Sequence, residues 1–125
     1  KSNFDTKVRP VLTTMAIHEI NSAGINPYIW KLEGYNRKED IDKISDSIIG
    51  DSKIIILGRS ESMTKVLKWI KIGKQNGKVI GFAVGRTIFM KSLVDYNRKK
   101  ISREKAIKDI SKNYLKIINY YKNSK

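Results

Sequence analysis

The sequence contains no cysteine and only one histidine, His18. Without cysteine the chain can form neither a disulfide framework nor a thiolate nucleophile. A single histidine leaves no His-cluster metal site, and a Ser-His relay within this chain would have to use His18. His18 lies beside a helical apolar stripe, between polar neighbours, and we interpret it as a surface residue. We therefore expect no metal site and no bound cofactor.

Long apolar runs are also missing. No segment approaches the roughly eighteen uninterrupted apolar residues that a membrane span requires, and we expect no signal peptide. We expect a cytoplasmic protein without a membrane partner. The 125 residues, 40% of them hydrophobic, are enough for one domain with a buried core. Because the chain begins at Lys1 and not at methionine, we expect a trimmed chain or a piece of a longer polypeptide.

The net charge of +14 comes from 26 basic and 12 acidic residues. Such a balance is the electrostatic footprint of a nucleic-acid binder. The layout of the charges argues against a specific nucleic-acid partner, because Tyr114 and Tyr121 fall on the apolar face of the last predicted helix and cannot stack on bases. The opposite face carries the lysines Lys105, Lys108, Lys112 and Lys116. We interpret the lysine excess as surface composition.

Three short segments have the β-branched and aromatic content of strands. They are Pro27–Glu33, Lys53–Leu57 and Val79–Val84, each bounded by glycine, proline or polar residues. The continuous apolar run Lys53–Leu57 is typical of a strand covered on both faces. Helical patterns separate the three segments, so the sequence predicts the α/β class, with parallel βα units.

Apolar spacing also predicts the helices. The first ends at Gly24, and its buried face is expected at Leu12, Met15, Ala16, Ile20 and Ala23. The second buries Ile41, Ile44 and Ile48. The third is expected to begin at residues 58–60. A short segment with Phe89 follows the last strand. The final helix is expected to begin after Ser102, which caps it.

Lys31 and Glu33 are unusual in a buried strand. Side chains alternate along a strand, so both point to the face opposite Trp30 and Leu32. An ammonium group removed from water is costly unless it is paired or loses its proton. The sequence leaves two readings open. Lys31 is structural, either in an interior ion pair with Glu33 or at a strand end that reaches solvent, or it is chemically useful.

Polar residues follow all three strands. The carboxyl ends of parallel strands meet at one edge of the sheet, where the working residues of such folds collect. Glycine lets the backbone approach an anion, a helix start offers free amide donors, and arginine can grip two phosphate oxygens. A lysine among arginines suits imine formation, since neighbouring positive charge favours the neutral amine. The residues concerned are Lys31, Glu33, Gly58, Arg59, Gly85 and Arg86.

Three motifs carry a resemblance to a known family. Pro-Tyr-Ile-Trp-Lys-Leu-Glu-Gly, Ile-Ile-Ile-Leu-Gly-Arg and Ile-Gly-Phe-Ala-Val-Gly-Arg-Thr-Ile-Phe occur in this order. They resemble the 2-deoxy-5-keto-gluconate 6-phosphate aldolase-like domains, which are related to the tagatose 1,6-bisphosphate aldolases and are often fused to a sugar kinase. The resemblance runs from about Arg9 to Tyr121.

The resemblance implies a class I aldolase built as a TIM (β/α)8 barrel. Residues 1–125 would form a single domain or fragment, the last three strands of that barrel with their helices. Lys31 would form a Schiff base with a ketone such as dihydroxyacetone phosphate, and Glu33 would keep the acidic position of the motif. The substrate phosphate would bind Gly85 and Arg86, with Gly58 and Arg59 completing the pocket.

Further expectations follow from the same resemblance. The substrate would be a small phosphorylated keto sugar acid of inositol catabolism, and the isolated chain would associate with the missing barrel half or with itself. Two alternatives stay open at this point. The chain could be a non-catalytic sugar-phosphate-binding domain or, as the less favoured choice, a basic nucleic-acid-binding module.

Overall fold

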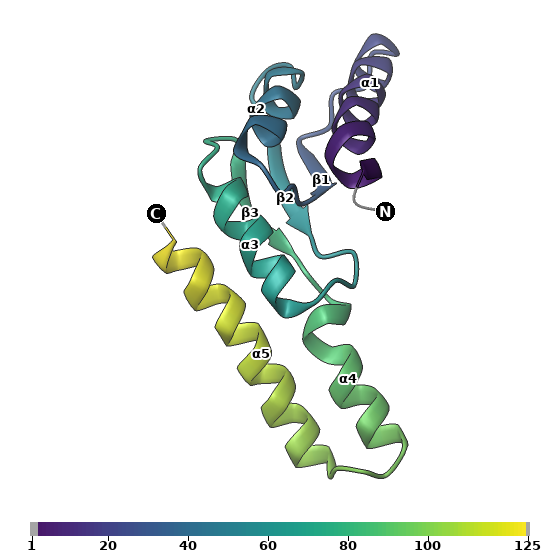
Figure 1. Ribbon diagram of the computed structural model, residues 1–125, viewed down its shortest axis with the longest axis vertical. Coiled ribbons are helices and arrows are strands. Elements are labelled where there is room, and N and C mark those ends of the chain that lie inside the picture. Colours follow the sequence, from purple (N-terminus) through teal and green to yellow (C-terminus); the bar gives the residue numbers. More distant parts are fainter. Residues whose placement is uncertain (1–2, 125) are drawn as a thin grey trace.

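The computed structural model describes residues 3–124, so Lys1, on which the expectation of a longer polypeptide rests, lies outside the described residues. The predicted alternation of helices and strands is confirmed (Figure 1). In chain order the elements are a short π-helix η1 (Phe4–Val8), α1 (Arg9–Ser22), β1 (Ile29–Glu33), α2 (Lys38–Asp46), β2 (Lys53–Leu57), α3 (Met63–Lys74), β3 (Val79–Ala83), α4 (Arg86–Asn97) and α5 (Arg103–Asn123).

The three strands form one sheet in the order β1-β2-β3, with both pairs parallel. The predicted α/β class with parallel βα units is therefore confirmed. The register places Lys31 beside Ile55 and Ile55 beside Gly81, in one row across the sheet. Since all three strands run in the same direction, their carboxyl ends lie at one edge.

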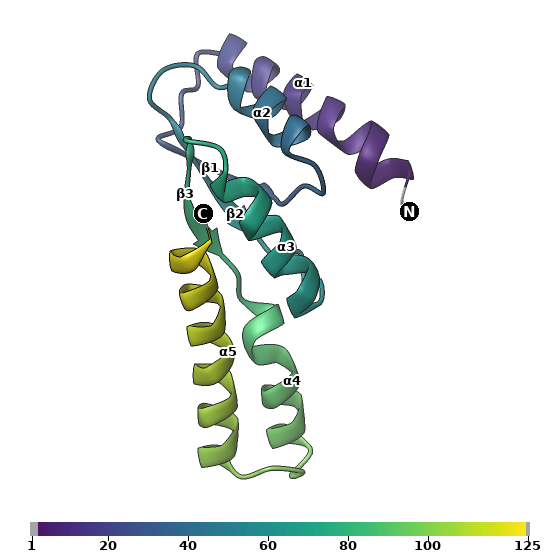
Figure 2. The same cartoon turned by 60° about the vertical axis from the view of Figure 1, so that its left-hand side comes forward.

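Helices pack on one face of this sheet and form two apolar clusters. The first cluster joins strand residues such as Trp30, Ile54 and Ile56 to Ile44 of α2 and Trp69 of α3. The second joins α3, α4 and α5 through Val66, Ile70, Val84, Ile88 and Ile117. α4 and α5 form a helical hairpin that extends well beyond the carboxyl end of β3 (Figures 1 and 2).

The opposite face of the sheet is open, which corrects the expectation of strands covered on both sides. Ile29 and Ile80 are 40% and 48% exposed, and Ile55 and Leu57 are only partly buried. No helix formed by residues 3–124 covers this face. A continuous apolar run indicates that both faces need cover, but it does not indicate which segment of which chain supplies it.

The predicted face of α1 was wrong. Leu12 and Met15 are 48% and 60% exposed, whereas Ile17 is fully buried. Arg9 and Pro10 are also buried on the inner side. On this inner side Arg9 forms ion pairs with Asp5 and Glu33, which an apolar stripe does not indicate. The predicted end of the helix at Gly24, whose φ is +80°, agrees with the structure.

The helices that follow β2 and β3 also differ from the prediction. α3 begins at Met63, where Ser62 caps it by accepting a hydrogen bond from the Lys65 amide at 3.3 Å. Residues 58–61 form a loop instead of the first turn. The short segment with Phe89 is a full helix, α4, and the cap of α5 at Ser102 is confirmed.

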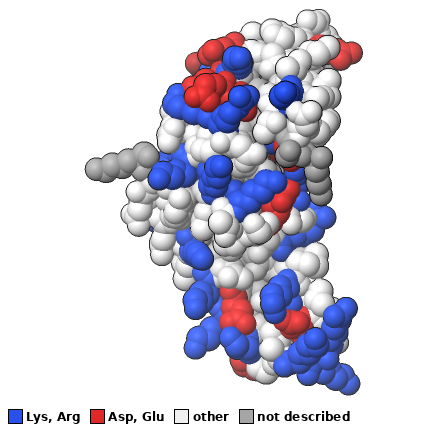
Figure 3. Space-filling view, in the orientation of Figure 1, with Lys and Arg blue, Asp and Glu red and all other residues white. Residues whose placement is uncertain are grey.

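Basic side chains gather over the part of the molecule built by α4 and α5 (Figure 3). The four lysines predicted on the outer face of α5 are exposed, as is His18. Tyr114 is 49% exposed, so its predicted burial was wrong, although its ring still packs edge-on against Phe82 with centroids 6.4 Å apart. Within residues 3–124, no helix has the length and apolarity to cross a membrane.

Candidate functional site

Lys31 of β1 and the segments that follow β2 and β3 line an open cavity of about 340 Å³ at the carboxyl edge of the sheet. Five of the six residues that the sequence singles out lie on its wall. The exception is Glu33. The lining residues are Lys31, Leu57, Gly58, Arg59, Ser60, Ala83, Gly85, Arg86, Thr87 and Phe89.

Lys31 reaches this cavity from the open face of β1. It stands in the row with Ile55 and Gly81, and its side chain is exposed. Within the described part of the chain it takes part in no ion pair, so the predicted pairing with Glu33 is not formed. Glu33 is instead bound by two arginines. The ion pair with Glu33 is thereby excluded, whereas the exposure of Lys31 fits a strand end that reaches solvent. A chemical role for Lys31 remains a prediction.

The start of α4 forms the second wall. Gly85 is the N-cap residue, and its carbonyl accepts the amides of Ile88 and Phe89 at 2.8 and 3.3 Å. The amides of Arg86 and Thr87 precede the first helical hydrogen bond, so they remain available as donors. Arg86 is exposed and forms no ion pair with any residue among 3–124. A helix N-terminus with a cation beside it attracts anions.

The loop after β2 forms the third wall. Gly58 is buried, and a Cβ atom there would lie 3.0 Å from Cγ1 of Val84. An alanine at this position would therefore require the Val84 side chain to shift by a few tenths of an ångström. Arg59 and Ser60 follow with φ values of +48° and +59°, a left-handed conformation that non-glycine residues seldom adopt. The Thr87 hydroxyl donates to the Glu61 carbonyl at 2.8 Å, which joins this loop to α4.

Arg59 does not direct its guanidinium group to the cavity as a free cation. Its Nη1 and Nη2 atoms bind the two carboxylate oxygens of Asp5, each at 2.9 Å. The same group binds Glu33 at 3.0 Å and Glu61 at 2.9 Å. The phosphate-binding role of Arg59 remains a prediction, and its backbone is the part that is free for it.

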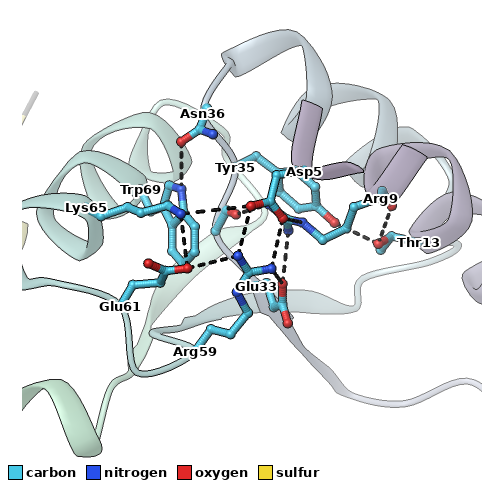
Figure 4. Close-up of polar contacts among 11 residues, drawn as sticks. Asp5, Arg9, Thr13, Glu33, Tyr35, Asn36, Arg59, Glu61, Lys65 and Trp69 are labelled. Carbon is cyan, nitrogen blue, oxygen red and sulfur yellow. Dashed lines mark hydrogen bonds and ion pairs between the residues drawn. The ribbon is translucent and has the colours of Figure 1, made fainter. Parts of the chain in front are cut away.

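Arg59 belongs to a group of alternating charges that we call the charged cluster (Figure 4). Arg9 donates from Nε to Asp5 at 3.1 Å, and its Nη1 lies 3.4 Å from Glu33. The indole ring of Trp69 lies beneath the cluster, 5.7 Å from the Arg59 guanidinium carbon. The members are Asp5, Arg9, Glu33, Arg59, Glu61 and Lys65.

The cluster changes the acidity of its members. The hydrogen bonds from Arg59 lower the pKa of Asp5 from 3.8 to about 2, against the opposing effect of burial. The hydrogen bond from Arg59, followed by that from Lys65, lowers the pKa of Glu61. The hydrogen bond to Asp5 in turn raises the pKa of Arg59. These shifts favour the ionised forms of Asp5, Glu61 and Arg59 at neutral pH.

A second cavity of about 340 Å³ lies on the other side of Lys31. It shares Lys31 and Leu57 with the first cavity, and Glu33 lies on its wall. Lys31 thus stands between the two cavities. The second is lined by Arg9, Thr13, Lys31, Leu32, Glu33, Tyr35 and Leu57.

The sequence reasoning missed most of the charged cluster. Asp5 with Arg9, and Glu61 with Lys65, stand four residues apart, and this spacing is the local signal that could have marked them. No local pattern could have paired Asp5 with Arg59, because 54 residues separate them. Trp69, fully buried against Gly34, was also missed.

Among residues 3–124 no group of three or more histidine and carboxylate side chains could hold a metal ion. A family model described as "Uncharacterized protein conserved in bacteria (DUF2090)" matches residues 3–125, nearly the whole chain. No curated protein and no solved structure matches this chain.

Proposed function

The chain belongs to the DUF2090 family, and we propose that it forms the carboxyl-terminal part of a class I aldolase in which Lys31 carries the chemistry. One observation carries the proposal. An exposed lysine without an ion pair, a helix N-terminus and an arginine without an ion pair, all within residues 3–124, share one cavity at the ends of three parallel strands. A phosphorylated ketone needs this combination.

Lys31 is proposed as the Schiff-base residue. Its amine nitrogen would form a bond to the ketone carbon, and the ketone oxygen would leave as water after accepting two protons. The protonated imine would then accept the electron pair of the carbon–carbon bond that breaks. Glu33, two residues away on the same face, is proposed to carry protons to and from this centre.

The phosphate group is proposed to bind at the start of α4. The amides of Arg86 and Thr87 would donate to its oxygens, and the Arg86 guanidinium would add charge-assisted hydrogen bonds. Gly85 allows close approach on this side and the loop of Gly58 and Arg59 bounds the other. Phosphate sites after the last two strands are typical of TIM barrels.

The resemblance supplies the specific substrate of the proposal. It would be a phosphorylated keto sugar acid, 2-deoxy-5-keto-gluconate 6-phosphate in inositol catabolism, cleaved to dihydroxyacetone phosphate and an aldehyde. The barrel is part of the proposal too. Within residues 3–124, β1 and β3 each have a strand neighbour on one side only, so the remaining strands of a TIM barrel would continue the sheet at these two edges.

Borohydride reduction tests the proposal. The protein is reduced in the presence of dihydroxyacetone phosphate, and the adduct is located by intact mass and peptide mapping. We expect one adduct on Lys31, which inorganic phosphate suppresses. Lys53→Met is the matched control, because Lys53 is on the neighbouring strand at the opposite, amino end of the sheet. The adduct should persist in Lys53→Met and vanish in Lys31→Met.

Adducts spread over the surface lysines, or unchanged in Lys31→Met, would contradict the aldolase proposal. A second candidate is a sugar-phosphate-binding domain without catalysis. The observation that favours it is that the α4 start and Arg86 form an anion site which does not need Lys31. In that case Lys31→Met would leave phosphate binding nearly unchanged and the wild-type protein would form no adduct.

A further inference from the structure

The Gly58–Ser60 loop has a conformation that its sequence does not favour. Arg59 and Ser60 are consecutive left-handed residues, and neither is glycine. Backbone strain of this kind persists only where the surroundings hold it. Two sets of hydrogen bonds fix the conformation of this loop. The Glu61 amide donates to the Gly58 carbonyl at 2.9 Å, and the Arg59 side chain makes four hydrogen bonds.

Asp5 makes the two-point contact among these. Both of its oxygens bind the guanidinium at 2.9 Å, the fork geometry that fixes orientation as well as distance. Its side chain is 8% exposed, and Arg9 holds it from the other side at 3.1 Å. Asp5 belongs to η1, so the contact ties the amino-terminal helix to the loop after β2 (Figure 4).

We propose that Asp5 is a positioning residue of the anion cavity, which acts through Arg59 to hold the Gly58–Ser60 loop in its left-handed shape. The inference rests on the proposed phosphate site, since the loop forms one wall of that cavity. Asp5 itself does not line the cavity. It would set the spacing between the loop and the start of α4, where the phosphate oxygens bind.

The inference makes a prediction of definite sign. Asp5 is a carboxylate near an anion site, so by charge alone its removal should tighten phosphate binding. Removal should also release two of the four hydrogen bonds of the Arg59 guanidinium, which would tighten binding further if this group could reach the anion. A positioning role predicts the reverse, because the loop loses its shape and phosphate must then bear the cost of ordering it.

The reciprocal effect is expected at the amino terminus. If Asp5 couples η1 to the loop, phosphate bound in the cavity must stabilise the docked helix by the same free energy by which the docked helix strengthens phosphate binding. Amide hydrogen exchange in η1 and early α1 should therefore slow when phosphate is added. Exchange in α5, which does not border the cavity, should not change.

Titration calorimetry with inorganic phosphate tests the proposal in wild-type protein, Asp5→Asn and Asp95→Asn. The control removes one carboxylate in the same way, but Asp95 pairs with Lys91 near the far end of α4. We expect Asp5→Asn to bind phosphate about tenfold more weakly and Asp95→Asn to bind as the wild type does. Asp5→Glu, which keeps the charge, should recover part of the affinity.

Equal or tighter binding by Asp5→Asn would overturn the inference. Should Asp5→Asn fail to fold, Arg59→Lys tests the same contact, since lysine keeps the charge and loses the fork. Hydrogen exchange of the loop amides without ligand separates the two proposals. If the wild type binds no phosphate but the loop amides exchange faster in Asp5→Asn, the anion site is disproved and Asp5 still holds the loop. If the loop amides exchange at the same rate in both proteins, the positioning role is disproved.

Discussion

At the scale of the residue, the charged cluster shows how a buried carboxylate can be kept ionised. Asp5 is almost completely buried, which by itself would favour the neutral acid, yet two arginines surround it. Breaking such a pair leaves an uncompensated buried charge and costs far more than an exposed ion pair contributes. The cluster therefore has a measurable consequence for acid stability.

We predict that the free energy of unfolding falls between about pH 4 and pH 2 because of Asp5. Its pKa is about 2 in the folded protein and 3.8 ordinarily, so the unfolded chain takes up the proton first as the pH falls. The stabilisation by ionised Asp5 is complete above about pH 4 and amounts to about 2 kcal/mol. Lowering the pH through the folded pKa removes it.

Urea unfolding of the wild type and of Asp5→Asn at a series of pH values measures this contribution. The difference in unfolding free energy between the two proteins should shrink as the pH falls from about 4 to 2. A difference that stays constant over this range would show that Asp5 does not titrate with a lowered pKa.

At the scale of the element, the contact between the end of β1 and α3 depends on the absence of one side chain. A Cβ atom at Gly34 would collide with Cβ and Cγ of Trp69, atoms that cannot move without the helix backbone. Trp69 is fully buried, and its indole Nε1 donates to the Asn36 side chain at 3.0 Å. The end of β1 and the turn before α2 therefore both contact the indole ring of Trp69 on α3.

Gly34→Ala should lower the free energy of unfolding by about 3 kcal/mol, because overpacking at a fixed contact forces strain or backbone shifts. Gly77→Ala is the control. A methyl group on Gly77 would have no neighbouring atom within 4 Å, and the φ of this residue is not left-handed, so a change within about 0.5 kcal/mol is expected there. Chemical denaturation of both variants measures the effect; equal stabilities would refute the account of Trp69 packing.

At the scale of the whole molecule, the open face of the sheet is the main unsatisfied surface. Ile29 and Ile80 are exposed on the two outer strands, and exposed apolar patches beside free strand edges favour association. We predict that the isolated chain self-associates in a concentration-dependent way. The proposed barrel gives the same surface a different occupant, namely further βα units.

Sedimentation velocity tests this prediction with Ile29→Lys and Ile80→Lys, which place a charge on the open face. Both should shift the protein toward monomer. Ile49→Lys is the matched control, because Ile49 is 48% exposed in the turn before β2 and off the sheet. A wild-type chain that is monomeric at every concentration, or variants that associate as it does, would contradict the role assigned to the open face.

The sequence by itself determined the class of fold and the place of the candidate site. Strand identity followed from short apolar runs, and the carboxyl edge followed from topology, because parallel strands must end on one side. Lys31, Gly58, Gly85 and Arg86 could therefore be brought to one cavity without coordinates. These are consequences of local patterns and of chain direction.

Only the tertiary structure decided where the charged groups point. The apolar stripe of α1 suggested Leu12 inside, but the helix buries Ile17 and Arg9, and Arg9 pairs there with Asp5 and Glu33. Arg59 was expected to face an anion and instead binds three carboxylates, one of them 54 residues away. Long-range ion pairs leave no periodic trace in a sequence, because their geometry exists only after the elements have packed.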